Sequence, residues 1–212
     1  MPEAEAKLTL YHSPQSRSTI VRWMLEEIGE PYAIEPINLA KGQQLEPAYL
    51  TINPMGKVPA LRHGNVVVTE VAAICCYLAD RFPSAKLAPA IDAPDRGAYL
   101  KWLFFASGCI EPAVIHKAMK WPEGRRGTIG WANYDTTMNV LKDGVVLARP
   151  WLLGERFSAA DVVVGAQVRW GLQFGTIPRH PAFEAYAARL GQRPALQRQE
   201  AADAALAAQL ET

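Results

Sequence analysis

The sequence predicts an α/β domain followed by an all-α helical domain. Within residues 1–82, short apolar strands alternate with amphipathic helical segments, a pattern typical of a βαβ unit. Residues 83–94 contain three prolines among small and charged residues, which indicates a linker. From residue 95 to residue 212, apolar residues recur at helical spacing. We therefore expect an N-terminal domain at 1–82, a linker at 83–94 and a helical domain at 95–212.

The first domain begins with a strand, a helix and a second strand. Residues 7–11 form a short apolar strand, and the helix at 18–28 places apolar residues at i, i+3 and i+4. Gly29 suits the end of that helix. Residues 32–37 then form a strand parallel to the first, which completes a βαβ unit. The remaining elements of this domain are a hairpin with strands at 60–62 and 66–68 and a helix at 71–82.

The helical domain follows from the same periodicity. Pro112 should kink its first helix, because proline removes a helical hydrogen bond. Ser158 and Asp161 have the spacing of a capping box and indicate the start of the third helix. The five expected helices lie at 95–119, 131–147, 158–172, 181–190 and 194–210.

Composition narrows the function. The chain has 22 Lys and Arg against 21 Asp and Glu, a net charge of +1, so no nucleic-acid partner is expected. The N-terminus lacks a signal-peptide pattern and no apolar run approaches a membrane span. A cytoplasmic location without a membrane partner is therefore expected. The three cysteines lack CxxC or metal-ligand spacing, which predicts reduced thiols and no metal.

The most informative stretch is 53–61, with the sequence Asn-Pro-Met-Gly-Lys-Val-Pro-Ala-Leu. Pro59 precedes a strand, a position that tolerates a residue without an N–H group. We expect the Val58-Pro59 bond to be cis, because an X-Pro bond adopts this form at small cost in tight turns. The N–H and C=O of Val58 would then be free to pair with an extended peptide. The alternative is that Pro59 is a simple turn proline.

The second part of the expected peptide-binding site lies at Thr69-Glu70, where a strand ends and a helix begins. The free N–H groups and positive dipole end of a helix start attract a carboxylate. The carboxylate of Glu70 can itself bind an ammonium group. A backbone clamp beside these groups describes a site for a short peptide with a free amino terminus. Glu70 alone is also explained as a first-turn residue favoured by the helix dipole.

Together, the βαβ start, the 53–61 stretch, Thr69-Glu70, the proline linker and the cap at 157–161 resemble a cytosolic glutathione S-transferase of the bacterial, serine-type kind. The resemblance covers nearly the whole chain. It implies a thioredoxin-like N-terminal domain, an all-helical C-terminal domain and a homodimer. It also implies a detoxification enzyme that conjugates glutathione, its co-substrate, to electrophilic small molecules.

The resemblance also implies which residues contact glutathione. Val58, beside Pro59, would clamp the cysteinyl backbone, and Glu70 would bind the γ-glutamyl amino group. Lys57 and Gln44 would reach toward the glycyl carboxylate.

Val71 departs from the family pattern, which usually has a serine here for the γ-glutamyl carboxylate. The backbone N–H of Val71 remains, but a hydroxyl donor is lost. This residue keeps open a second hypothesis, in which the chain is a non-catalytic relative that binds a small ligand or a partner protein through the same fold.

Three hydroxyl groups are candidates for activating the glutathione thiol. The thiolate is the nucleophile, and a hydrogen bond from a hydroxyl near a helix N-terminus favours it. Ser16 lies just before the first helix, as in the serine-type classes, and is preferred over Ser13 and over Tyr11, which is placed as in the tyrosine-type classes. The alternative is that the serines are turn and N-cap residues. This connector has no cysteine, which argues against a disulfide mechanism.

The electrophile is expected to bind between the two domains. Trp102, Phe105 and Trp170 are candidates for its pocket, although aromatic residues at helical spacing are more often core residues. His63 and His116 are expected on the surface. The sequence does not identify the electrophile, because its pocket is expected to be formed by helix faces that carry no recognisable motif.

Overall fold

The structure is a computed structural model that describes residues 7–210. The chain divides into two compact units, the first including residues 7–85 and 193–210 and the second residues 86–192. The C-terminal segment 193–210 therefore packs with the first unit, whereas the sequence-based boundaries assigned it to the helical domain. Helical periodicity identified this helix but carried no information about which unit would bury it.

The first unit is built on a mixed four-stranded sheet in the order β2-β1-β3-β4. β1 pairs in parallel with β2, and β3 is antiparallel to both β1 and β4. These pairings confirm the βαβ start and the hairpin that the sequence predicts. The strands are β1 (Leu8–His12), β2 (Tyr32–Pro36), β3 (Ala60–His63) and β4 (Val66–Thr69).

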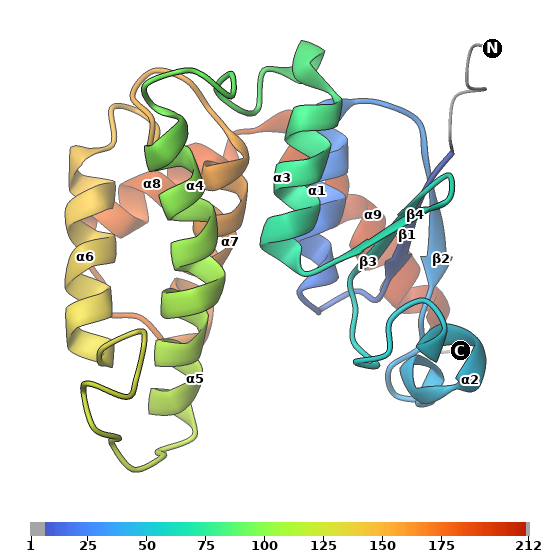
Figure 1. The fold of residues 1–212 in the computed structure, drawn as a ribbon, viewed down its shortest axis with the longest axis horizontal. Helices are drawn as coiled ribbons and strands as arrows, with labels where there is room; N and C mark the ends of the chain where they lie inside the picture. Colours follow the sequence, from blue (N-terminus) through green and yellow to red (C-terminus); the bar gives the residue numbers. More distant parts are fainter. Residues whose placement is uncertain (1–6, 211–212) are drawn as a thin grey trace. The chain divides into compact units, whose positions relative to one another are not determined.

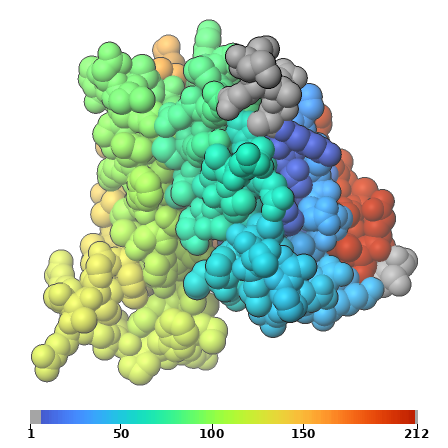
Figure 2. Space-filling view, turned by 45° about the vertical axis from the view of Figure 1, so that its right-hand side comes forward, coloured from blue at the N-terminus to red at the C-terminus, as the bar shows by residue number. Residues whose placement is uncertain are grey.

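Three helices of the first unit pack side by side. α1 (Ser18–Ile28) lies between α3 (Val71–Arg81) and α9 (Pro194–Leu210), as Figure 1 shows. α1 ends at Gly29, whose φ of +79° suits glycine. The short elements η1 (Gln43–Leu45), α2 (Pro47–Leu50) and η2 (Pro83–Ala85) complete the unit. The segment around α2 appears in light blue on the face of the first unit that Figure 2 shows. The core of the unit includes Leu10, Ile20, Met24, Leu25, Leu61, Ile74 and Leu78.

The second unit is helical. Tyr99, Leu103, Phe183 and Tyr186 are among the fully buried side chains of its core. Its elements are α4 (Arg96–Phe105), η3 (Ala106–Ile110), α5 (Glu111–Ala118), α6 (Tyr134–Leu147), α7 (Ala159–Phe174) and α8 (Pro181–Gly191). α6 begins three residues later than expected, because Asn133 caps it by accepting a hydrogen bond from the Thr136 N–H at 2.8 Å.

The first helix of this unit changes geometry in its middle. η3 is a π-helical turn between α4 and α5, and it comes just before Pro112, where the sequence predicts a kink. A π turn changes the local hydrogen-bond pattern, and proline has no N–H to donate. The stretch Arg96–Ala118 has a mean hydropathy of 1.2 over its most apolar part and is long enough to cross a bilayer. This differs from the expectation that no such run exists, although core helices of soluble proteins share the property.

The start of α7 confirms the capping box that the sequence predicts. The Asp161 carboxylate accepts hydrogen bonds from the Ser158 N–H at 3.0 Å and from the Leu152 N–H at 2.9 Å. It also accepts one from the Tyr186 hydroxyl on α8 at 2.8 Å. Burial raises the pKa of Asp161, and these donors oppose that shift. One carboxylate therefore joins two helices and the loop before them.

Candidate functional site

Strand register brings the predicted peptide-binding residues to one end of the sheet. Tyr11 at the end of β1 pairs with Ala60 at the start of β3, and Ala60 pairs with Thr69 at the end of β4. The connector after β1, the turn before β3 and the start of α3 therefore meet at the same sheet edge. Each of these segments belongs to the first unit. The edge thus collects the serines, Val58 and Glu70.

The turn before β3 has the backbone geometry that the sequence predicts. The Val58-Pro59 bond is cis. The carbonyl of Lys57 accepts hydrogen bonds from the Tyr49 hydroxyl at 2.6 Å and from Asn53 Nδ2 at 2.7 Å. Within the described part of the chain, no hydrogen bond involves the N–H or C=O of Val58. Two side chains hold the peptide before Val58 and leave its own polar groups available.

Tyr49 and Asn53 are functional candidates that the sequence reasoning missed. Burial is the main cause that raises the pKa of Tyr49 to about 12, so the phenol keeps its proton and donates to the Lys57 carbonyl near neutral pH. Asn53 is buried, and its Oδ1 also accepts from the Met55 N–H at 3.1 Å. The buried asparagine at the head of the turn was a usable signal, since a short polar side chain there bonds nearby backbone.

Glu70 has a backbone conformation that is rare for its residue type. Its φ is +67°, and its side chain is exposed at the N-cap of α3. Such conformations persist only where surrounding structure imposes them, and they cluster at ligand sites. The half-buried Val71 follows at the first helical position, where no intrahelical acceptor exists for its N–H.

Gln44 lies against this turn, and Lys57 is one of the turn's own residues. The backbone of Gln44 in η1 packs against Gly56, where an added Cβ would lie 3.2 Å from the Gln44 carbonyl oxygen. Gly56 also has a φ of +61°, so glycine suits both its space and its conformation. Gln44 Oε1 is buried and has no hydrogen-bond partner among the described residues. Lys57 follows Gly56 in the turn and is exposed.

The connector between β1 and α1 arranges its serines around one carbonyl. Ser16 Oγ lies 2.7 Å from the Ser13 carbonyl oxygen and 2.7 Å from Ser18 Oγ, and it accepts from the Ser18 N–H at 3.2 Å. Tyr11 packs edge-on against Tyr49, with ring centroids 5.8 Å apart. Ser16 and Tyr11 are both half-buried, whereas Ser13 is buried.

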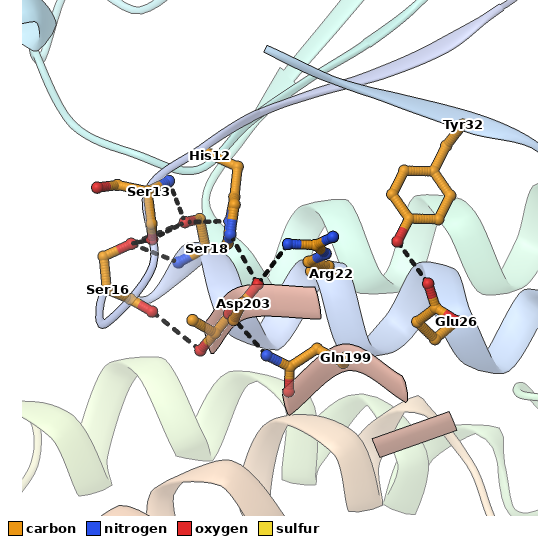
Figure 3. A network of polar contacts seen from close by, with 10 residues as sticks. His12, Ser13, Ser16, Ser18, Arg22, Glu26, Tyr32, Gln199 and Asp203 are labelled. Atoms are coloured by element: carbon orange, nitrogen blue, oxygen red, sulfur yellow. Dashed lines mark hydrogen bonds and ion pairs between the residues drawn. The ribbon is translucent and has the colours of Figure 1, made fainter. Parts of the chain in front are cut away.

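A buried polar network lies behind these serines (Figure 3). Ser18 Oγ is 2.8 Å from His12 Nδ1, and His12 Nε2 is 3.0 Å from Asp203 Oδ1. Arg22 donates to the same carboxylate oxygen at 2.6 Å, and Gln199 Nε2 donates to Asp203 Oδ2 at 2.7 Å. Sequence reasoning missed this network, because no local pattern links His12 to an aspartate on α9.

The aromatic residues expected to line an electrophile pocket differ in exposure. Trp102 is 6% exposed, and its ring packs against Gly144 of α6 in the core of the second unit. Phe105 and Trp170 are half-buried. Phe105 meets Trp102 edge-on, with centroids 5.6 Å apart. Trp102 thus has a packing role, and the other two aromatic residues keep surface that a ligand can contact.

His63 and the cysteines contribute no further reactive centre. His63 is buried, contrary to the expectation of a surface residue, and its Nδ1 lies 2.8 Å from the Tyr77 hydroxyl. Burial raises the pKa of the Cys75 and Cys109 thiols, which disfavours their thiolates. No group of three metal-ligating side chains is found within residues 7–210.

A mixed four-stranded sheet with a cis-proline turn before β3, joined in sequence to a helical unit, defines a thioredoxin-like protein with an all-helical domain. Residues 6–80 match the family model described as Glutathione S-transferase, N-terminal domain. The chain is 30% identical over 171 residues to Glutathione S-transferase 1 of Dianthus caryophyllus, covering 76% of each chain. The chain belongs to the cytosolic glutathione S-transferase family.

Two further similarities extend over nearly the whole chain. Disulfide-bond oxidoreductase YfcG of Escherichia coli (strain K12) is 28% identical over 201 residues, which cover 89% of this chain and 92% of that protein. A solved glutathione transferase homolog from sulfitobacter, with bound glutathione, is 28% identical with a TM-score of 0.75. That alignment covers 92% of this chain and 97% of the solved chain.

Proposed function

We propose that this protein is a glutathione transferase that stabilises the glutathione thiolate and conjugates it to electrophilic small molecules. The convergence of Ser16, Val58 and Glu70 at one sheet edge carries this proposal. One short peptide can then meet all three groups: Ser16 donates to its sulfur, Val58 pairs with its backbone and Glu70 binds its amino group. Membership in the family supports glutathione as that peptide.

Each part of glutathione has a proposed partner at this edge. The N–H and C=O of Val58 pair with the cysteinyl backbone, as a strand pairs with a sheet edge. The Glu70 carboxylate binds the γ-glutamyl ammonium group, and the Val71 N–H at the start of α3 binds the γ-glutamyl carboxylate. Lys57 and Gln44 lie toward the glycyl end.

The proposed catalytic step is ionisation of the bound thiol. A free thiol has a pKa of about 8.5, so only a few per cent is thiolate at neutral pH. A hydrogen bond from Ser16 Oγ, at the start of α1, stabilises the thiolate and lowers that pKa. The thiolate then attacks an electrophilic carbon and displaces its leaving group. Phe105 and Trp170 are proposed to contact the apolar body of this electrophile.

The experiment pairs a glutathione-affinity column with a chlorodinitrobenzene conjugation assay. Retention with turnover is expected, and the thioether product identifies a transferase. Retention without turnover would instead support the non-catalytic relative, which binds a ligand through the same fold. Failure of both would remove glutathione from the proposal.

A disulfide substrate in the same assay tests a second candidate activity. The similarity to a disulfide-bond oxidoreductase favours this candidate. A bound glutathione thiolate can attack a disulfide sulfur without any protein thiol, which removes the objection from the missing CxxC motif. Turnover of hydroxyethyl disulfide with no turnover of chlorodinitrobenzene would assign the protein to that chemistry.

A further inference from the structure

The network behind Ser16 contains a base that the proposed transferase reaction does not use. His12 is 0% exposed, and a deeply buried imidazole with both ring nitrogens in hydrogen-bond contact is a defined proton acceptor. Its Nδ1 is connected to Ser16 through a single hydroxyl, Ser18 Oγ, by contacts of 2.8 and 2.7 Å. Ser18 is likewise 0% exposed, which excludes bulk water from this path.

The partners of Asp203 determine the tautomer of His12. Arg22 and Gln199 both donate to the Asp203 carboxylate, which therefore acts as a hydrogen-bond acceptor. The ring nitrogen that faces it, Nε2 at 3.0 Å, must then carry a proton. In neutral His12 this leaves Nδ1 as the acceptor, directed at Ser18 Oγ.

We infer that Ser16 and Ser18 form a proton relay from the bound thiol to His12, with Asp203 as the counter-charge of the resulting imidazolium. This inference rests on the proposed function, because glutathione supplies the proton. In the step, the thiol proton moves to Ser16 Oγ, the Ser16 proton moves to Ser18 Oγ, and the Ser18 proton moves to His12 Nδ1. Thiol plus neutral His12 becomes thiolate plus imidazolium, so charge and protons balance.

The hydrogen-bond capacities of both serines are satisfied before the step. Ser18 Oγ accepts from the Ser13 N–H at 3.0 Å and from Ser16, and it donates to His12. Ser16 Oγ accepts from the Ser18 N–H and from the thiol. Each oxygen thus uses one hydrogen and two lone pairs.

The hydrogen-bond capacities of both serines are also satisfied after the proton transfer. Ser18 Oγ accepts from His12 Nδ1–H and from the Ser13 N–H, and it donates to Ser16. Ser16 Oγ accepts from Ser18 and donates to the thiolate sulfur. The Ser13 carbonyl lies 2.7 Å from Ser16 Oγ and can accept from it when no thiol is bound.

The charged groups around His12 come from two helices. Asp203 on α9 faces Nε2, and Arg22 on α1 donates to the same carboxylate oxygen. Arg22 also partly opposes the rise in the pKa of Tyr32, whose hydroxyl donates to Glu26 at 2.6 Å. Asp203 is therefore the charge in direct contact with the imidazole, and Arg22 donates to the same carboxylate (Figure 3). His12 is a positioning residue that acts on the thiol through Ser18 and Ser16.

The test counts protons. Glutathione and S-methylglutathione are each titrated by calorimetry in two buffers of different ionisation enthalpy. The difference between the two ligands gives the number of protons that the thiol alone releases to solvent. The ultraviolet thiolate band gives the fraction ionised. The relay predicts a thiolate band in the parent protein near neutral pH with no proton released per thiolate, because His12 retains it. One proton released per thiolate in the parent would overturn the relay, and this measurement requires no substitution.

Variants provide a second, independent readout. His12→Gln keeps a polar side chain but cannot hold the proton, so each thiolate should release one proton and the thiol pKa should rise by about one unit or more. His63→Gln is the matched control, because His63 is also buried in the first unit and contacts a hydroxyl. It should keep the parental proton count.

An unchanged proton count in His12→Gln would contradict the relay while leaving thiolate stabilisation by Ser16 intact. Absence of binding or of any thiolate band in the parent protein would instead refute the proposed function, and the relay with it. The two failures therefore give different observations.

Discussion

In the proposed reaction, the half-buried Ser16 hydroxyl supplies the hydrogen bond that stabilises the charged sulfur. Its oxygen has an acceptor on one side, the Ser13 carbonyl, and Ser18 on the other. Tyr11 and Ser13 remain the alternative donors from the sequence. Ser13 is buried, and the Tyr11 ring packs against Tyr49. The three hydroxyls can therefore be separated by single substitutions.

Ser16→Ala should raise the pKa of the bound glutathione thiol and lower turnover at neutral pH about tenfold to a hundredfold. A hydrogen bond to a charged group contributes about 1.5–3 kcal/mol, which converts to that change in rate. Glutathione affinity should change little. The measurement is the pH dependence of kcat, with Ser84→Ala, an exposed serine, as the control. A profile that overlays the parent, while Tyr11→Phe shifts it, would move the role to Tyr11.

Val71→Ser should tighten glutathione binding by about 1.5–3 kcal/mol, because the new hydroxyl adds a bond to the γ-glutamyl carboxylate. Valine methyl groups desolvate that charge without compensating it. Calorimetric titration with glutathione measures the effect. Ala73→Ser adds the same hydroxyl two residues further along α3 and should leave affinity unchanged. No gain from Val71→Ser would place the carboxylate elsewhere or argue for a different ligand.

At the scale of elements, α2 and the turn after it hold the proposed peptide clamp in place. Tyr49 at the end of α2 and Asn53 in the turn both donate to the Lys57 carbonyl. This arrangement fixes the peptide that precedes Val58 without using the polar groups of Val58 itself. The clamp is therefore positioned by a neighbouring element, in addition to the register of β3.

Tyr49→Phe should weaken glutathione binding by about 0.5–1.5 kcal/mol, the net contribution of a neutral hydrogen bond. The loss is limited because Asn53 still holds the Lys57 carbonyl. Tyr49→Phe combined with Asn53→Ala should lose more than the two single changes together, since either donor partly substitutes for the other. Tyr134→Phe, which removes a hydroxyl bonded to the Thr176 carbonyl in the second unit, is the control. Equal affinity in the parent and the double variant would show that the turn needs neither donor.

At the scale of the whole molecule, the chain returns from its helical unit to its first unit at Arg193. The guanidinium forms a two-point pair with Glu27 at the end of α1, with both N–O distances at 2.6 Å. The Glu27 side chain is 6% exposed and that of Arg193 is 26% exposed. α9, which follows Arg193, then carries Asp203 to His12. The C-terminal helix thus completes a network that begins in β1.

Arg193→Ala should lower the free energy of unfolding by about 1.5–3 kcal/mol, because it leaves a buried carboxylate without its charged partner. Arg193→Lys should restore only part of that loss, since an ammonium cannot form the paired geometry. Urea denaturation measures both. Arg179→Ala removes an exposed pair with Glu184 and should cost about 0–1 kcal/mol. Equal costs for Arg193→Ala and Arg179→Ala would mean that the Glu27 pair does not anchor α9.

Local chemistry determined much of this protein from its sequence. Periodicity located the βαβ unit, the hairpin and the ends of α1 and α9, because each depends on residues a few positions apart. The turn residues at 53–59 and the capping box at Ser158 and Asp161 were also readable, since their hydrogen bonds close over short spans. The prediction of a site at Val58 and Glu70 followed from the same local rules.

The tertiary structure decided what joins distant parts of the chain. His12 and Asp203 are 191 positions apart, and no propensity or spacing rule pairs residues at that separation. For the same reason, the sequence did not predict that residues 193–210 pack with the first unit or that His63 is buried. A side chain's surroundings depend on which surfaces pack together, and packing buries apolar area without regard to order along the chain.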